Sequence, residues 1–279
     1  MPKPLLLGMV LAQLLACTHP RPPMTSSHQN ATPEEAVRTY FLAADSHSSR
    51  LLRQAFHPAV LMQWVDGERG ALKTLTQLEW WQRLDAEAAH PEPALERRWT
   101  VLDREGPFAL MEAVSRWPDH VFNDLLLVVE TPTGWRIVGK VFQRVGAGEQ
   151  VAASASEVEA IRAVLEGKIE AHAVYSPALL HETHTPDCRY YRLHVEGVPF
   201  TWVPLSEAAA RYALNQEAGV QDRDSPWRIL QVEVRGNVAA AKLDVVVEGT
   251  RFIDHLLLVR ADGRWRISAA AWGDPRPRP

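Results

Sequence analysis

The chain has 279 residues, of which 46% are apolar and 23% charged, with a formal net charge of −4. This is the composition of an ordinary globular protein, and it excludes an intrinsically disordered chain. The slightly acidic balance also excludes the broad basic surface that nucleic-acid-binding domains carry. The length allows for one or two domains.

The first sixteen residues have the features of a secretory leader. One basic residue, Lys3, precedes an apolar run from Leu5 to Ala16, which is too short to span a bilayer as a mature helix. The run ends in Leu14-Leu15-Ala16-Cys17, which resembles a bacterial lipobox. The resemblance implies cleavage of residues 1–16 and a lipid on Cys17. Because Thr18 follows and not Asp, it also implies the outer membrane. The alternative is a plain signal peptide with a chance cysteine.

The segment after this cysteine is rich in Pro and Ser and lacks periodicity. We therefore expect residues 17–31 to be the lipidated cysteine and a flexible tether. In the remainder, Cys188 has no second cysteine to pair with, which excludes a disulfide framework. The fold must rest on its hydrophobic cores.

Two helix starts share one pattern. Thr32-Pro33-Glu34-Glu35 combines an N-cap hydroxyl, an early Pro and a Glu at the third position, which predicts a capping box. Ser156-Glu157-Val158-Glu159 repeats it, and apolar residues follow both at helical spacing. Each helix leads to a Pro step, Phe56-His57-Pro58 and Tyr175-Ser176-Pro177, with the two Pro residues 119 apart (177 − 58).

The second half of each unit matches at a constant offset of 130 residues (265 − 135). The matched pairs are Thr76 with Ser206, Gly106 with Gly236, Phe122 with Phe252, Asp124 with Asp254, and Trp135 with Trp265. The two offsets predict 11 extra residues (130 − 119) in the second unit, near His181–Pro204. We therefore expect two domains, residues 32–145 and 156–273, joined by a small polar linker at 146–155.

Each unit is predicted to contain a helix, a short helix, a strand pair, a third helix and four long strands. Turn signals such as Arg104-Glu105-Gly106-Pro107 and Ala261-Asp262-Gly263 separate the long strands. Strands joined by tight turns are antiparallel. The expected fold class is therefore α+β: two tandem cone-shaped domains, each a curved antiparallel sheet wrapped around about three helices.

Two strand motifs carry a family resemblance, Phe122-Asn123-Asp124-Leu125-Leu126-Leu127 and Gly134-Trp135-Arg136-Ile137-Val138-Gly139-Lys140-Val141-Phe142. Together with Phe56-His57-Pro58 they resemble the putative lumazine-binding family of the nuclear transport factor 2-like superfamily. The resemblance covers nearly all of residues 32–273, in two copies. The second copy keeps Asp254 and Trp265 but has Ser176 for His57, Ala270 for Lys140 and Trp272 for Phe142. The resemblance implies a cone that hosts isomerases, dehydratases, ligand carriers and interaction modules.

The open end of such a cone usually forms a pocket. In the first unit the candidate lining residues are Tyr40, His57, Trp64, Trp80, Trp81, Asp124 and Lys140. A buried aspartate can act as a general base, and Tyr or His can polarise a carbonyl. The alternative is structural: Asp124 and Lys140 form an ion pair on neighbouring strands, and His57 serves the helix-to-strand step. Trp80 and Trp81 point about 100° apart, so one is expected in the core and the other toward the pocket or a neighbour.

Metal and cofactor signals are weak. His181-Glu182-Thr183-His184, followed by Asp187 and Cys188, contains zinc-type ligands, but its histidines are three apart (184 − 181) and not the four of an HExxH motif. An exposed hairpin tip is the simpler interpretation, and we expect no metal. The sequence also lacks a Gly-rich phosphate loop, a Gly-x-Ser-x-Gly motif and a Cys-x-x-Cys motif, so we expect no cofactor.

The favoured interpretation is a lipid-anchored protein of the cell envelope, without enzymatic activity, that binds a small apolar molecule or an envelope protein. The two domains are expected to pack as an intramolecular pseudo-dimer, because tandem fusion raises their effective concentration. The alternative is an isomerase or lyase acting on a small apolar carbonyl compound in the first cone. Because the two copies differ at their candidate site residues, a ligand is expected first in the unit before residue 146.

Overall fold

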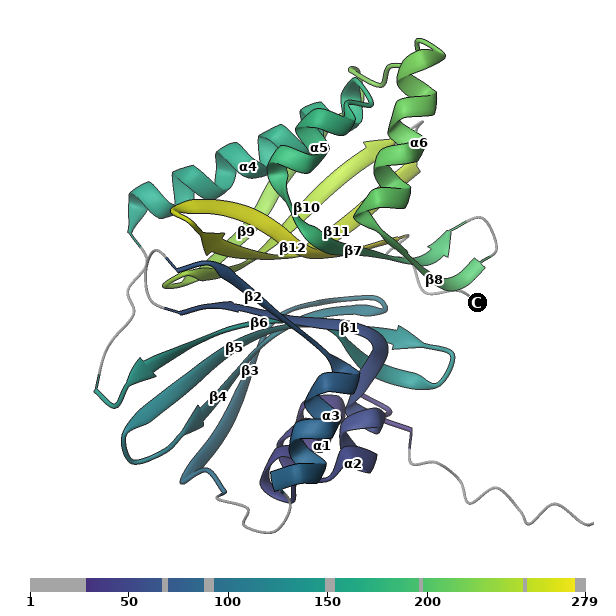
Figure 1. Cartoon of the computed structure of the whole chain (residues 1–279). Coiled ribbons are helices and arrows are strands. Elements are labelled where there is room, and N and C mark those ends of the chain that lie inside the picture. Colours follow the sequence, from purple (N-terminus) through teal and green to yellow (C-terminus); the bar gives the residue numbers. More distant parts are fainter. Residues whose placement is uncertain are drawn as a thin grey trace, which may run out of the picture.

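Two units of the same architecture are stacked sheet against sheet, with their helices on the outer sides (Figure 1). The computed structural model describes residues 29–66, 70–87, 93–148, 154–195, 198–247 and 250–273. The predicted leader, Cys17 and most of the predicted tether lie outside the described residues. None of the described helices combines the length and apolar character needed to cross a bilayer.

Within its described residues, the first unit consists of three helices and one six-stranded sheet. Its elements are α1 (Pro33–Asp45), α2 (Ser49–Ala55), β1 (Phe56–Val65), β2 (Leu72–Thr76), α3 (Gln77–Glu87), β3 (Glu96–Glu105), β4 (Phe108–Arg116), β5 (His120–Thr131) and β6 (Gly134–Gly146). The strands lie in the order β2-β1-β6-β5-β4-β3.

The second unit repeats this order of elements and of strands. Its elements are α4 (Ala155–Ala173), α5 (Pro177–Thr183), β7 (His184–Val195), β8 (Val198–Pro204), α6 (Leu205–Glu217), β9 (Trp227–Arg235), β10 (Val238–Val247), β11 (Thr250–Ala261) and β12 (Arg264–Gly273). Its sheet order is β8-β7-β12-β11-β10-β9. The predicted α+β class and the tandem repeat of one cone are confirmed.

The sheets differ from the prediction in one detail. Neighbouring strands are antiparallel except β1 with β6 and β7 with β12, which are parallel, because a crossover and not a hairpin joins them. Each of the long hairpins β5–β6 and β11–β12 contains a register shift, after Leu127 and after Leu257. Bulges of this kind bend a sheet, and their equivalent positions give both cones the same curvature.

The predicted alignment of the two units is wrong up to and including the third helix, where Thr76 corresponds to Pro204 and not to Ser206. β1 begins at Phe56 and β7 at His184, an offset of 128 residues (184 − 56). Pro58 in β1 therefore corresponds to Pro186 in β7, whereas Pro177 is the first residue of α5. The predicted insertion of 11 residues does not exist. The offset changes by only two residues (130 − 128), between the third helix and the strand after it.

The same offset changes the predicted counterparts of three site residues. His57 corresponds to Thr185 and not to Ser176, which is instead the N-cap of α5. The offset of 130 would match the adjacent tryptophans of α3 with residues 210 and 211. Because α3 begins at Gln77 and α6 at Leu205, they correspond instead to two alanines of α6, at 208 and 209.

The two helix starts are only partly as predicted. Thr32 is the N-cap of α1, and its hydroxyl accepts a hydrogen bond from the Glu35 amide. In the second unit the capping box is made by Ser154 with Glu157, so α4 begins before the predicted Ser156 cap. The first unit also begins before residue 32, because Asn30 is buried and its side chain donates to the carbonyl of Trp135.

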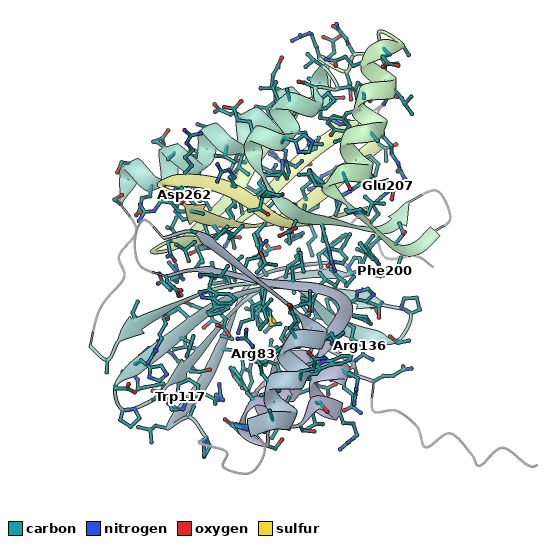
Figure 2. The ribbon with its side chains drawn as sticks, in the orientation of Figure 1. Arg83, Trp117, Arg136, Phe200, Glu207 and Asp262 are labelled. Carbon is teal, nitrogen blue, oxygen red and sulfur yellow. The ribbon has the colours of Figure 1, made fainter. Side chains whose placement is uncertain are left out.

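Three hydrophobic clusters hold the molecule together, and strand alternation assigns residues to them. Along β5, Leu126 and Val128 face the helices of the first unit, whereas Leu125, Leu127 and Val129 face the second unit. An equivalent cluster lies inside the second cone. The middle cluster contains side chains from both sheets, so the two units share one core. Figure 2 shows side chains filling the space between the sheets, with Phe200 at this boundary.

Equivalent residues meet at the centre of this shared core. A Cβ added to Gly139 would lie 2.9 Å from the Cβ of Ala269, and these residues are related by the offset of 130 (269 − 139). In a symmetric pair, a position on the twofold axis contacts its own copy. The stacked units therefore have an approximate twofold axis that passes close to Gly139 and Ala269.

Candidate functional site

A buried polar triad lies between the helices and the sheet of the first unit. Tyr40 comes from α1, Asp124 from β5 and Lys140 from β6. The Tyr40 hydroxyl donates to Asp124 Oδ2 (2.7 Å), and Lys140 Nζ donates to the same oxygen (2.5 Å) and to the Tyr40 hydroxyl (2.6 Å). All three are candidate site residues predicted from the sequence, and the structure brings them into direct contact.

Burial dominates the electrostatics of the triad. Asp124 is fully buried, and Tyr40 and Lys140 are almost so. Burial raises the pKa of Tyr40 well above its usual value, and the neighbouring Asp124 charge adds to the effect. Burial also lowers the pKa of Lys140, although the Asp124 carboxylate opposes this. The second carboxylate oxygen, Asp124 Oδ1, is buried and has no hydrogen-bond partner among the residues that the structure describes.

Aromatic rings surround the lysine. Lys140 Nζ lies 4.6 Å from the ring centroid of Tyr40, 4.9 Å from that of Phe142 and 5.6 Å from that of Trp80. Trp64 stacks on Phe142 at 5.1 Å, so it extends the aromatic surface from β6 onto β1. Both Trp64 and Trp80 are half-buried. A cation held over several ring faces is stabilised by their quadrupoles.

Two predicted site residues lie elsewhere. The His57 ring faces Tyr191 and Phe200 of the second unit, and its Nδ1 accepts a hydrogen bond from the Ala59 amide. Burial lowers the His57 pKa to about 4. Trp81 turns away from the triad toward α2, where the Arg53 guanidinium lies 4.6 Å from its ring centroid. Of the adjacent tryptophans, Trp80 is therefore the one that contacts the site.

Two aromatic residues of the site were missed. Phe142 was part of the family motif but was not predicted as a site residue. Its spacing of two from Lys140 places both side chains on the same face of β6. Phe56 packs edge-on against Tyr40 (5.3 Å) and Trp80 (5.3 Å). Its place just before the Pro step was visible, but no periodicity indicated which face it occupies.

The second unit keeps the aspartate and takes its lysine from another element. Lys168 Nζ of α4 lies 2.6 Å from Asp254 Oδ2 of β11. Lys168 stands at the position of Tyr40 (168 − 40 = 128), and Ala270 stands at the position of Lys140. The carboxylate is thus paired in both cones, from the strand side in the first and from the helix side in the second.

Two histidines of the second cone, His172 and His184, bond to tyrosines of its interior. His172 Nδ1 lies 3.2 Å from the Tyr212 hydroxyl, and His184 Nε2 lies 2.6 Å from the Tyr190 hydroxyl. Burial lowers the His184 pKa to about 3. Within the described residues, no group of three or more His, Cys, Asp or Glu side chains could hold a metal ion. The segment that contains His184 is not the exposed hairpin tip that the sequence favoured.

Comparison with known proteins assigns both halves of the chain to one family. The profile described as putative lumazine-binding matches residues 28–143 and 156–273. No curated protein matches the chain. Solved structures similar to half of it include an NTF2-like protein of unknown function from Silicibacter pomeroyi, at 22% identity and a TM-score of 0.39, covering 43% of this chain and 98% of that one.

Two further solved structures also match slightly less than half of this chain. An NTF2-like protein of unknown function from Methylobacillus flagellatus is 19% identical, with a TM-score of 0.39, and the match covers 45% of this chain and 98% of that one. A ketosteroid isomerase-like protein from Erwinia carotovora atroseptica is 18% identical, with a TM-score of 0.35, and the match covers 44% of this chain and all of that one.

Proposed function

Because this chain belongs to the putative lumazine-binding family, with one domain of the family in each half, we propose that it is a non-enzymatic binding module whose first unit takes a small, largely apolar ligand. The observation that carries the proposal is the buried Asp124 carboxylate. One of its oxygens is held by Tyr40 and Lys140, and the other is buried with no partner in the described part of the chain.

The chemistry of the triad defines what such a ligand must offer. A buried acceptor without a partner is unfavourable by about 1–3 kcal/mol, so an N–H or O–H group donated to Asp124 Oδ1 would be strongly favoured. The half-buried Trp64 and Trp80 provide apolar surface beside it. The site therefore fits a compact ligand with an apolar or aromatic body and a hydrogen-bond donor at one end.

The alternative, an isomerase or lyase, requires a carboxylate that is free to take a proton. The geometry favours this less, because Lys140 Nζ lies 2.5 Å from Asp124 Oδ2 and neutralises the charge of the carboxylate. His57, the other candidate base, faces the second unit and not the cone interior. A binding role does not require Asp124 to leave Tyr40 and Lys140 or to take up a proton.

A lipid anchor on Cys17 completes the proposal and rests on the lipobox-like Leu14-Leu15-Ala16-Cys17. We expect the mature protein to begin at an acylated cysteine and to face the periplasm or the cell surface from the outer membrane. Mass spectrometry of the N-terminal peptide tests this, with Cys17→Ala as the comparison. An unacylated N-terminus in the wild-type protein would disprove the anchor and leave the ligand site unaffected.

Native mass spectrometry of the full chain purified from its own envelope tests the ligand site. We expect a reproducible bound mass in the wild-type protein that Asp124→Asn abolishes. The matched control is Asp262→Asn in the exposed β11–β12 turn, which should keep that mass. A chain without bound small molecule, or one whose bound mass survives Asp124→Asn, would contradict the proposed site. Conversion of an added carbonyl compound would favour the enzyme, and a co-purified protein an interaction role.

A further inference from the structure

Acidic side chains of the first unit meet basic side chains of the second at one edge of the shared interface. Lys242 Nζ of β10 lies 2.8 Å from Asp103 Oδ1 and 2.7 Å from Glu105 Oε2, both on β3. His255 Nε2 of β11 lies 2.7 Å from Asp103 Oδ2, and Arg251 approaches Glu105 at 3.6 Å. The carboxylates that cross the interface in this cluster belong to the first unit, while Arg251 is also held by Asp244 of its own unit at 2.9 Å.

In a second cluster, too, the first unit supplies a carboxylate and the second unit supplies the cation. Arg235 of β9 donates from Nε to Glu112 Oε1 of β4 at 2.7 Å, and its Nη1 lies 3.4 Å from Glu233 Oε2 of its own strand. The carboxylate from the first unit is again paired with a cation from the second. The side chains are mostly buried, with exposed fractions of 9% for Lys242, 17% for Glu112 and 28% for Arg235.

The two clusters occupy equivalent places around the approximate twofold axis. With the offset of 130, Glu105 corresponds to Arg235 (235 − 105) and Glu112 corresponds to Lys242 (242 − 112). The pair Glu105–Lys242 therefore maps onto the pair Arg235–Glu112 with both charges reversed. Both positions carry opposite charges in the two units, although β4 and β10 pair with β5 and β11 in the same register.

This reversal matters for which surfaces can pair. If two first units met face to face with this geometry, Glu105 of each would oppose Glu112 of the other, with Asp103 close by. If two second units met, Arg235 would oppose Lys242. Like charges brought together across an interface cost several kcal/mol. These side chains are largely removed from solvent, so screening by salt would relieve little of that repulsion.

The ionisation of the paired groups agrees with strong pairing. Burial alone would lower the pKa of Lys242, yet its hydrogen bonds to Asp103 and Glu105 raise it above the usual value. Burial alone would raise the pKa of Asp103, yet hydrogen bonds from His255 and Lys242 lower it. The bond to Glu112 raises the pKa of Arg235.

We propose that the reversed charges at Glu105, Glu112, Arg235 and Lys242 make the two sheet faces select each other and reject a second copy of themselves. The leucines of the interface do not make this distinction, because Leu127 and its counterpart Leu257 present similar surfaces to either partner. The partner that fits the sheet face of the first unit is therefore the second unit. The chain closes on itself and does not assemble through these faces with other chains.

Recoding the charges in the full chain tests the proposal. The basic variant, E105K/E112R, gives both faces cations, and the acidic variant, R235E/K242E, gives both faces carboxylates. We expect each to open: the pairing constant of the two units falls on the order of a hundredfold or more, the radius of gyration rises, and the urea midpoint drops. The exchanged variant, with all four substitutions, should regain the wild-type radius and most of the midpoint.

Mixing the two opened variants provides a selectivity test. Because the first unit of the basic variant complements the first unit of the acidic variant, an equimolar mixture should form a 1:1 dimer in light scattering, while each variant alone remains monomeric. The control for net charge is E166K/E217R, two exposed positions on α4 and α6, which should remain compact. The proposal is overturned if the recoded variants keep the wild-type radius and midpoint. It is also overturned if the exchanged variant fails to recover, or if the mixture stays monomeric.

Discussion

The two cones pair their buried aspartate in different ways, and one arrangement can be transplanted into the other. In the first unit Lys140 reaches Asp124 from β6, whereas in the second Lys168 reaches Asp254 from α4. We predict that Lys140→Ala strongly destabilises the chain and that adding Tyr40→Lys restores much of the loss. The double variant reproduces the residues that the second unit has at these positions.

The magnitude follows from the burial of the pair. The side chains of Lys140 and Asp124 are 7% and 0% exposed, so solvent screens their attraction very little. Removing one partner of a buried ion pair typically costs about 3–5 kcal/mol. Because the Tyr40 hydroxyl still donates to Asp124 in Lys140→Ala, we expect the lower end, about 3 kcal/mol.

Tyr40→Lys returns a cation to the carboxylate but removes a ring that packs against Phe56 and Trp80. Each such aromatic pair contributes about 0.5–1.5 kcal/mol beyond its buried area. The two pairs together amount to about 1–3 kcal/mol, of which the apolar stem of the new lysine restores a part by packing in the same place. The double variant should therefore lie about 1–2 kcal/mol below the wild-type protein and above Lys140→Ala. Tyr40→Lys alone should also destabilise, because it places two lysines at one carboxylate.

Urea unfolding followed by tryptophan fluorescence gives the four free energies of this cycle at a common m-value. A matched control is Lys73→Ala on β2, which changes an exposed lysine and should shift stability by less than about 0.5 kcal/mol. A double variant no more stable than Lys140→Ala would refute the reasoning. It would mean that the aspartate does not require a cation, or that the helix cannot supply one.

Two further predictions concern the domain boundary and the start of the second unit. The pKa of His57 is lowered to about 4 from its usual 6.5, so folding stability should fall as pH drops from 6.5 to 4, where only the unfolded chain binds the proton. His57→Gln should reduce the slope of the unfolding free energy against pH by up to the equivalent of about one bound proton. Urea midpoints measured across that pH range check this, and an unchanged slope would contradict it. Ser154→Ala should destabilise by about 1 kcal/mol in thermal unfolding through loss of the capping box. Ser156→Ala should cost less than about 0.5 kcal/mol, and equal effects would contradict the assignment of the cap.

The long strands of both units could be predicted because their signals are redundant. The alternation of apolar residues, the turn glycines and the Trp135/Trp265 match all indicate the same offset. Upstream the only marker was a proline, and proline is tolerated both early in a helix and at the start of a strand. Pro177 and Pro58 are in those two different environments, so matching them misaligned the helices and displaced the counterpart of His57.

The triad was predictable residue by residue but not as an arrangement. Asp124, Lys140 and Tyr40 lie on three elements, and their side chains meet only because the curved sheet wraps around α1. His57 shows the limit of reasoning from a motif. It lies next to Phe56, which faces the cone, yet it faces the other unit, because successive strand residues point to opposite sides. Because the helices were misaligned, the sequence did not reveal that Lys168 occupies the position of Tyr40 in the second unit.

The contact between Gly139 and Ala269 bears on how the two halves could diverge. In an assembly of identical subunits, a residue on the axis faces itself, so one substitution enlarges both sides at once. Alanine at both positions would bring two methyl groups to about the 2.9 Å found for an added Cβ, and glycine at both would leave a gap the size of the one methyl group that Ala269 now supplies. A fused chain can place a larger residue on one side and none on the other. The size of a side chain thus breaks the symmetry at the centre, and any return to a symmetric assembly would meet a steric obstacle there.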